Sequence, residues 1–289
     1  MNKNLSILAA VAALVLPVSC HHDDFSGDDA TKIPSFKSFE EQFFINDVMN
    51  MKEVYTPTWG ADGKLSSMHI DYYSLEYDNE TDEPLDVALF QKQTLTYTWN
   101  SLSAEVASAV ESYDSDTGTW SPESPATYKL TFDDAWKVTE SVFSIGEYSE
   151  TYRYAYEGDY LITTEDVGDY HYNLTWKDGD LVQIVCIFDL GPISNTEYSF
   201  KYSSDENPFV DGINPLFQII EDDNILFGLA GKHSAHLPTE LNKKDFNGEI
   251  VMTYEYTRDS KGQITEVKII EPYDELFDMA VYNKYVFHY

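Results

Sequence analysis

Aromatic and aliphatic residues occupy every second position in many segments of the chain, and short polar turns rich in Asp and Gly separate these segments. A period of two places the apolar side chains on one face of a strand, and Asp-Gly or Gly-Asp between two such runs is typical of a β-hairpin. The clearest examples are residues 55–70, 128–143, 152–165, 172–188 and 252–270. The pattern therefore predicts a series of hairpins that form an antiparallel meander.

A weak repeat runs through these hairpins. The aromatic residues next to the turns, Phe132, Tyr156, Trp176 and Tyr202, are 24, 20 and 26 residues apart. Each interval has room for one hairpin, so successive repeats would add two strands at a time to the same sheet.

Two segments depart from the alternation. Between residues 207 and 241 the apolar residues are three and four positions apart, which indicates one or two short helical turns that plug or cover an end of the sheet. The spaced apolar residues are Phe209, Ile213, Leu216, Phe217 and Ile220. A weaker helical pattern covers residues 38–51, where Phe44, Val48 and Met51 would share one face.

The predicted fold is all-β: an antiparallel up-and-down meander that closes into a barrel or strongly curled sheet, with one or two short helical segments. A two-layer sandwich and an open sheet with charged edges are the alternatives. Barrel closure is favoured because it removes exposed strand edges and covers the aromatic side of every strand.

The N-terminus has the layout of a bacterial secretory signal. Lys3 precedes an apolar run from Leu5 to Leu16, which is too short to span a bilayer comfortably, and small residues lead up to Cys20. The stretch before Cys20 resembles the lipobox of bacterial lipoproteins, although Pro17 replaces the usual aliphatic residue. The resemblance implies that the Cys20 thiol carries lipid. We therefore expect a signal peptide at 1–19, an acidic flexible tether at 20–38 and a single β-rich domain at 39–289.

The chain is strongly acidic, with 18 Lys and Arg against 51 Asp and Glu and a formal net charge of −33. Nucleic-acid binding is excluded, because phosphate recognition needs a basic face. A lipidated Cys20 would leave Cys186 without a disulfide partner. Cys186 lies in an apolar run and is predicted to be a buried thiol in a strand.

Several hairpin segments resemble a family of Bacteroidetes-type lipoproteins known only as a domain of unknown function with a porin-like fold. They are "YEGDYLITT", "YNLTWKDGDLVQI", "YSFKYSSDENPFVDGINPLF", "FGLAGKHSAHLPTEL" and "YEYTRDSKGQITEVKI", between about residues 152 and 270. The family implies a barrel-like lipoprotein and brings no catalytic residues. "WGADGKL" at 59–65 is loosely similar to the tyrosine-aspartate repeats of bacterial wall and toxin-shell proteins.

The resemblance to lipoproteins extends to their sorting. Asp23, Asp24, Asp28 and Asp29 look like the acidic export signal that sends some of these lipoproteins to the cell surface. The final residues "YVFHY" resemble the assembly signal of outer-membrane barrels, which keeps a small transmembrane barrel open as an alternative. Spanning strands need about ten residues and an uncharged lipid-facing row, and the strands expected here are short and often charged. We therefore expect an anchored body outside the bilayer.

Candidate metal ligands are found at three places. "HHDD" at 21–24 lies in the expected tether, where nothing would hold ligands in geometry. His233, His236 and Glu240 have helical spacing, but Pro238 interrupts the turn, so a polar loop that leads into a strand is preferred. "DSDTG" at 114–118 lacks the later glycine and glutamate of a calcium loop and predicts a hairpin turn. No metal and no cofactor is expected.

The function expected from these features is a non-catalytic binding or envelope-structural module on the outer membrane. Its partners would be the membrane, through the lipid anchor, and either a glycan or another envelope protein. The candidate stacking residues for a sugar are Trp59, Trp99, Trp120, Trp136 and Trp176, with packing in the core as the alternative for each. A carbohydrate-active hydrolase is the rival hypothesis, although no catalytic motif is recognisable and no carboxylate pair can be selected.

Overall fold

The computed structural model describes residues 37–61, 64–77, 84–115, 117–135, 137–167, 170–188, 195–208, 234–246, 248–274 and 278–289. These residues form strands joined by turns. The strands are β1 (Ser38–Ile45), β2 (Val48–Trp59), β3 (Leu65–Tyr77), β4 (Pro84–Trp99), β5 (Ser103–Asp114), β6 (Thr119–Pro122), β7 (Ala126–Phe132), β8 (Val138–Ile145), β9 (Tyr148–Glu157), β10 (Tyr160–Asp166), β11 (Tyr170–Lys177), β12 (Asp180–Phe188), β13 (Thr196–Glu206), β14 (His236–Asp245), β15 (Gly248–Arg258), β16 (Ile264–Ile270) and β17 (Val281–His288). The described residues contain no helix that could cross a membrane.

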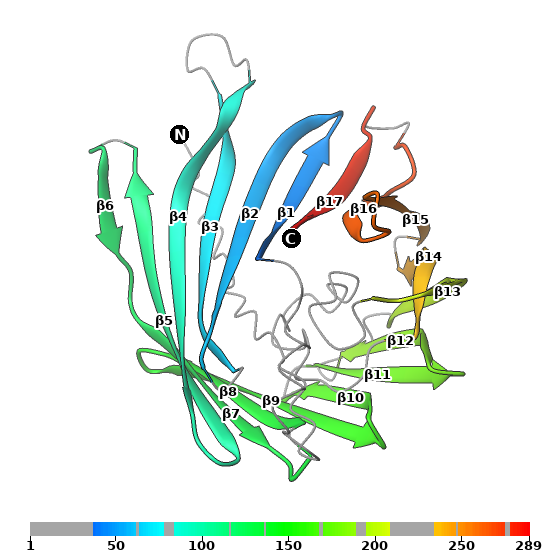
Figure 1. Ribbon diagram of the computed structural model, residues 1–289, viewed down its shortest axis with the longest axis horizontal. Coiled ribbons are helices and arrows are strands. Elements are labelled where there is room, and N and C mark those ends of the chain that lie inside the picture. The colour runs from blue at the N-terminus through cyan, green and yellow to red at the C-terminus, as the bar shows by residue number, and fades with distance from the viewer. Residues whose placement is uncertain are drawn as a thin grey trace.

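The strands form a closed antiparallel barrel of 16 strands (Figure 1). Apart from the short β6, each strand pairs with the strands before and after it in the ring, and β1 closes the ring by pairing with β17 from Ser38 opposite His288 to Ile45 opposite Val281. Strand β6 pairs only with residues 111–114 at the end of β5, and residues 103–108 of β5 pair with β7. The predicted up-and-down meander is confirmed, and the five predicted hairpin segments are β2–β3, β7–β8, β9–β10, β11–β12 and β15–β16.

We call the two ends of the barrel proximal and distal. The proximal end is where β1 begins and β17 ends, and it carries the connections that follow β2, β4, β7, β9, β11, β13 and β15. The distal end carries the connections that follow β1, β3, β5, β8, β10, β12, β14 and β16.

One face of the sheet carries a band of buried apolar side chains around the ring, together with buried polar residues such as Gln93, Ser108 and Ser141. Residues that lie opposite each other in paired strands point to the same side of the sheet. Phe39 of β1 lies opposite Tyr55 of β2, and Tyr55 lies opposite Ile70 of β3. On the other side of β1, Phe39 lies opposite Phe287 of β17, so these residues share one face of the closed sheet. Its side chains form one continuous core cluster. In a barrel made of one sheet, side chains from strands on opposite sides can pack together only in the interior. The face that carries the core cluster is therefore the inner face.

The outer face is polar and charged. Strand β5 buries Ala104, Val106 and Val110 but exposes Glu105 and Glu111, in strict alternation. Strands β7, β9 and β15 likewise expose Lys129, Arg153 and Glu255 beside buried aromatic neighbours. This is the reverse of a membrane pore, in which the outside is apolar and the lumen is polar.

Among the described residues, six aromatic bridges join strands at the proximal end. In each bridge an aromatic residue near the end of one strand donates a hydrogen bond, across a gap between hairpins, to the carbonyl of an inward-facing residue near the start of another strand. The bridges are Trp99 to Leu65, Tyr156 to Val138, Trp176 to Leu161, Tyr202 to Leu181, Tyr256 to Pro238 and Tyr289 to Ile264. Three members of the aromatic repeat, Tyr156, Trp176 and Tyr202, therefore form bridges, whereas Phe132 packs in the core without a donor.

Removal of one bridge is expected to cost little stability. In Tyr256→Phe the ring remains, but the Pro238 carbonyl loses the hydroxyl that donates to it at 2.7 Å. The free energy of unfolding should fall by about 1 kcal/mol. Urea unfolding followed by tryptophan fluorescence measures this change, with Tyr148→Phe as the control because the Tyr148 ring is exposed. An equal loss in both variants would mean that the bridge contributes nothing.

The helix predicted at residues 38–51 is wrong. These residues form β1, the start of β2 and a two-residue turn at Asn46 and Asp47, whose φ angles are 50° and 63°. Such positive angles suit the tight turn that joins twisted antiparallel strands. The helical spacing of Phe44, Val48 and Met51 arose because this turn happens to separate apolar residues of two strands.

The second predicted helical region is tested only at its edge. Residues 236–241, at that edge, belong to β14, which agrees with the expected polar loop that leads into a strand. Phe209, Ile213, Leu216, Phe217 and Ile220 lie outside the described residues. Cys186 is buried on β12, as predicted.

Candidate functional site

A groove opens at the proximal end where β10 and β11 separate. The two strands pair only from Thr163 to Asp166, opposite Asn173 to Tyr170. Strand β10 nevertheless begins at Tyr160 and β11 continues to Lys177, so both extend beyond their ladder. The Trp176 ring bridges this gap, and its Nε1 donates to the Leu161 carbonyl at 2.6 Å.

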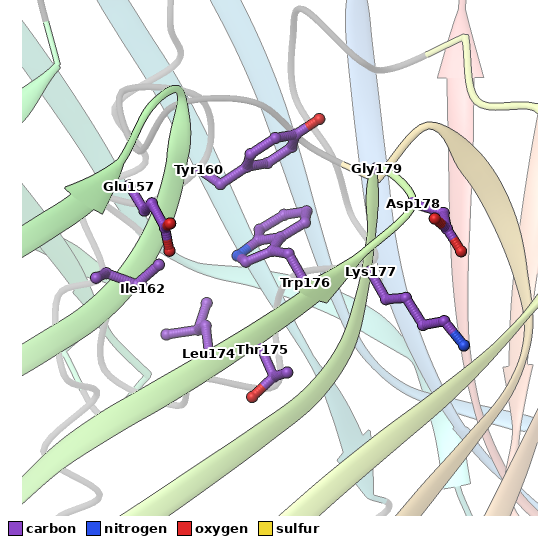
Figure 2. Close-up of a pocket in the computed structure, with 9 residues that line it drawn as sticks. All are labelled: Glu157, Tyr160, Ile162, Leu174, Thr175, Trp176, Lys177, Asp178 and Gly179. Atoms are coloured by element: carbon purple, nitrogen blue, oxygen red, sulfur yellow. The ribbon is translucent and has the colours of Figure 1, made fainter.

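The groove has a volume of about 460 Å³ and a mixed lining. Trp176 and Tyr160 form its aromatic centre, with ring centroids 4.8 Å apart and planes inclined by 37°. Figure 2 shows Glu157 on one side of this ring pair and Lys177 and Asp178 on the other. The full lining is Glu157, Tyr160, Ile162, Leu174, Thr175, Trp176, Lys177, Asp178 and Gly179.

The backbone around the groove is set by tight turns. Asp178 and Gly179 have φ angles of 54° and 89°, the conformation of a two-residue hairpin loop. Gly179 also lies against a second segment, since a Cβ atom there would meet the Ala235 Cβ at 3.4 Å. A larger residue at position 179 would therefore strain the turn and push against Ala235.

Residues 234–236 hold this turn in place. The Ala235 amide donates to the Gly179 carbonyl at 3.0 Å, and the Leu181 amide donates to Ser234 Oγ at 3.1 Å. The Asp180 carboxylate accepts from the His236 amide at 2.9 Å and lies 2.8 Å from His236 Nδ1. One side of the groove is therefore preorganised by contacts from residues 234–236, at the start of β14.

The groove combines groups that can recognise a sugar. Aromatic faces are electron-rich and attract the C–H edges of a pyranose ring, and carboxylate, ammonium and hydroxyl groups pair with its hydroxyls. Pockets that bind small molecules usually join such an apolar platform to a few polar groups. Glu157 provides a carboxylate acceptor and Tyr160 a hydroxyl beside Trp176, whereas the Lys177 side chain extends away from the ring pair in Figure 2.

The five candidate tryptophans do not converge on one surface. Trp176 alone among the described four lines the groove. Trp99 donates to the Leu65 carbonyl and Trp59 packs against the core. Trp120 lies on β6 with its ring 5.4 Å from that of Tyr113 and 4.4 Å from Lys92 Nζ. Trp136 lies outside the described residues.

The candidate metal ligands are separated in the described part of the chain. His236 pairs with Asp180, and Glu240 forms a 2.5 Å ion pair with Lys201. Thr117 and Gly118 lie in a turn after β5, as predicted, and Thr117 Oγ1 donates to Asp114. No group of three or more His, Cys, Asp and Glu is placed to hold a metal ion within the described ranges. His233, the "HHDD" stretch, Cys20, Asp23, Asp24, Asp28 and Asp29 lie outside them.

A carboxylate pair lies on the inner face near the closure of the barrel. Glu41 on β1 is the register partner of Glu53 on β2. The Tyr285 hydroxyl donates to Glu41 Oε1 at 3.1 Å, and the Tyr55 hydroxyl donates to Glu53. Burial raises the pKa of Glu53 above its ordinary value of 4.5, and the hydrogen bond from Tyr55 opposes this rise.

The raised pKa of Glu53 makes stability depend on pH. The folded state binds this proton more tightly than the unfolded state, so the stabilisation is complete below pH 4.5 and is lost as the pH rises through the raised pKa. Proton binding that is tenfold tighter in the folded state contributes about 1.4 kcal/mol to stability. Glu53→Gln should therefore flatten the decline in unfolding free energy as the pH rises above 4.5. Urea unfolding across this range measures it, and exposed Glu105→Gln should leave the wild-type slope unchanged.

Comparison with solved structures identifies the fold. A porin-like protein from Bacteroides uniformis ATCC 8492 matches with a TM-score of 0.62 and 15% sequence identity, over 88% of this chain and 97% of that chain. A porin-like protein from Bacteroides vulgatus ATCC 8482 gives a TM-score of 0.48 and 10% identity, over 88% and 98%. No family model and no curated protein matches. The chain therefore has a porin-like barrel fold, as the resemblance implied, and membership of the lipoprotein family stays a prediction.

Proposed function

We propose that this protein is a lipid-anchored lipoprotein of the outer membrane, exposed at the cell surface, whose barrel is a non-catalytic binding module. Cys20 carries the lipid, and the acidic run at Asp23, Asp24, Asp28 and Asp29 directs the protein outward. The proposal rests on the porin-like fold and, above all, on the polarity of the outer face.

The charged outer face favours a body that stands beside the bilayer. Lys129 and Arg153 are exposed within strands, and each such residue at the middle of a bilayer would cost about 2–4 kcal/mol. Glu105 and Glu255 add negative charge to the same face.

A body held outside the membrane by a tether is suited to binding. The groove at Trp176 and Tyr160 is the surface that we assign to the ligand, and a glycan is the ligand class that its rings and polar groups favour. Residues 21–37 would join the lipid to the proximal end, where β1 begins and the groove opens.

The test uses the mature chain from His21, without the lipidated cysteine. We expect it to be folded and monodisperse without detergent and to bind members of a glycan array. Trp176→Ala should weaken that binding at least tenfold, since aromatic anchors dominate such contacts. Trp120→Ala, on the outer face of β6, should bind as the wild type does.

Two outcomes would contradict this function. A chain that needs detergent to stay monodisperse would favour the transmembrane barrel. Hydrolysis of a glycan, lost in Glu53→Gln, would favour the hydrolase.

Directly opposed residues of an antiparallel pair have Cβ atoms about 5 Å apart, close to the carboxylate separation of about 5–5.5 Å in retaining glycosidases. The Glu41 and Glu53 pair is the observation that keeps this second candidate in the test.

A further inference from the structure

The groove at Trp176 contains a carboxylate that no other described residue neutralises. Glu157 and Tyr160 are register partners on either side of the turn that joins β9 and β10, and both line the groove. Figure 2 shows Glu157 on one side of the ring pair. Among the described residues, none donates a hydrogen bond to its carboxylate or forms an ion pair with it. A free carboxylate on a surface is ordinary, but this one lies beside an aromatic pair in a groove.

Neither lysine beside the groove is paired with Glu157. Lys137 belongs to the β7–β8 connection, where its Nζ donates to the Gly158 carbonyl at 2.5 Å and lies 3.9 Å from Asp133 Oδ2. Lys177 lines the groove, but its side chain extends away from the ring pair in Figure 2. The negative charge of Glu157 is therefore available to a ligand.

The other charged groups of the groove add no positive charge at the rings. Asp178 is also directed away from the ring pair in Figure 2. Asp180, the second residue after it, accepts from the His236 amide at 2.9 Å and lies 2.8 Å from His236 Nδ1, so this carboxylate is already paired. The lining itself holds two carboxylates, Glu157 and Asp178, and one ammonium, Lys177. A cationic ligand is therefore favoured over an anionic one.

The two rings suit the same kind of ligand. The Trp176 ring is held by the hydrogen bond from Nε1 to the Leu161 carbonyl, with the Tyr160 ring centroid 4.8 Å from its own. A cation within about 6 Å of a ring centroid is attracted by the negative face of the ring, and Trp attracts it most strongly. The Tyr160 hydroxyl forms no hydrogen bond with another described residue and can bond to a ligand.

We propose that the groove selects sugars that carry a free ammonium group, as glucosamine units do. This inference rests on the proposed glycan binding and names its ligand class. The ammonium group is attracted by the Trp176 and Tyr160 rings and donates a charge-assisted hydrogen bond to Glu157. N-acetylation removes that charge. A sugar carboxylate would be repelled by Glu157 and by the chain's net charge of −33.

The experiment compares three trisaccharides with the same β-1,4-linked backbone, made of glucosamine, N-acetylglucosamine or glucuronic acid. Each is titrated calorimetrically into the full-length protein extracted in detergent, at about pH 6, where a free amine carries a proton. We expect the glucosamine trisaccharide to bind roughly tenfold more tightly than its N-acetylated form, and the glucuronic acid trisaccharide to bind most weakly.

Substitutions separate the groove from the general attraction between opposite charges. Glu157→Gln should remove the preference for the free amine and leave the affinity for the N-acetylated trisaccharide unchanged. Glu105→Gln removes one negative charge from the outer face of β5, away from the groove, and should keep the wild-type preference. Trp176→Ala should weaken the binding of both trisaccharides.

Three results would overturn the inference: equal or tighter binding of the N-acetylated or acidic trisaccharide, a preference that survives Glu157→Gln, or an equal loss in Glu105→Gln. Neutral glycans that bind at Trp176 without any preference for an amine would leave the proposed function standing and defeat this inference alone. An absence of binding to every glycan would defeat both.

Discussion

Replacing Cys20 with alanine is expected to move the protein from the outer-membrane fraction to the soluble fraction. The mature chain begins with this cysteine if the lipobox functions, and its acyl chains supply the membrane affinity. A buried methylene contributes about 0.8 kcal/mol, so two or more chains anchor firmly and loss of all of them leaves no anchor. The charged outer face of the barrel offers no replacement.

Cell fractionation and incorporation of labelled palmitate measure this change together. The wild type should be membrane-bound and labelled, and Cys20→Ala should be soluble and unlabelled. Cys186→Ala is the matched control, because Cys186 is buried on β12 and should leave both readouts intact. Retention of unlabelled Cys20→Ala in the outer membrane would defeat the anchor and revive the transmembrane barrel.

Hairpins were predictable because their causes are local. Alternation in "YNLTWKDGDLVQIVCIF" determines which face each side chain occupies, and Asp178 and Gly179 accept the positive φ angles of the turn. The same local reading failed at residues 38–51. Three apolar residues at helical spacing could not reveal that β1 would find its second partner, β17, at the far end of the chain.

The groove could not be predicted from single strands, because its lining residues come from several neighbouring strands and turns. Trp176 was selected as an aromatic residue beside a turn, but Glu157, Tyr160, Lys177 and Asp178 were not. They line one groove because β10 and β11 pair only from Thr163 to Asp166, which leaves the proximal ends of both strands unpaired with each other. The sequence did contain a signal for this groove. "YEGDYL" and "WKDGDL" are the turns of two consecutive hairpins, and consecutive hairpins of a meander place their turns side by side at the same end of the sheet.

The closing seam is where a core substitution should do the most damage. Tyr285 on β17 lies opposite Glu41 of β1 and Val267 of β16 and is only 1% exposed. Tyr285→Ala removes the ring between these strands and leaves Glu41 without the hydroxyl that donates to it. We expect a loss of about 3–5 kcal/mol, as for other large aromatic residues truncated in a core.

Urea unfolding of the chain from His21 measures this loss as a midpoint lower by about 1–2 M. Tyr285→Phe, which keeps the ring, should lose only about 1 kcal/mol. Tyr273→Ala, at an exposed site, should change stability by less than about 0.5 kcal/mol. In a curled sheet that stays open, β17 would be an edge strand and Tyr285 would be partly solvated. A Tyr285→Ala variant as stable as Tyr273→Ala would therefore mean that β1 and β17 do not close the barrel in solution.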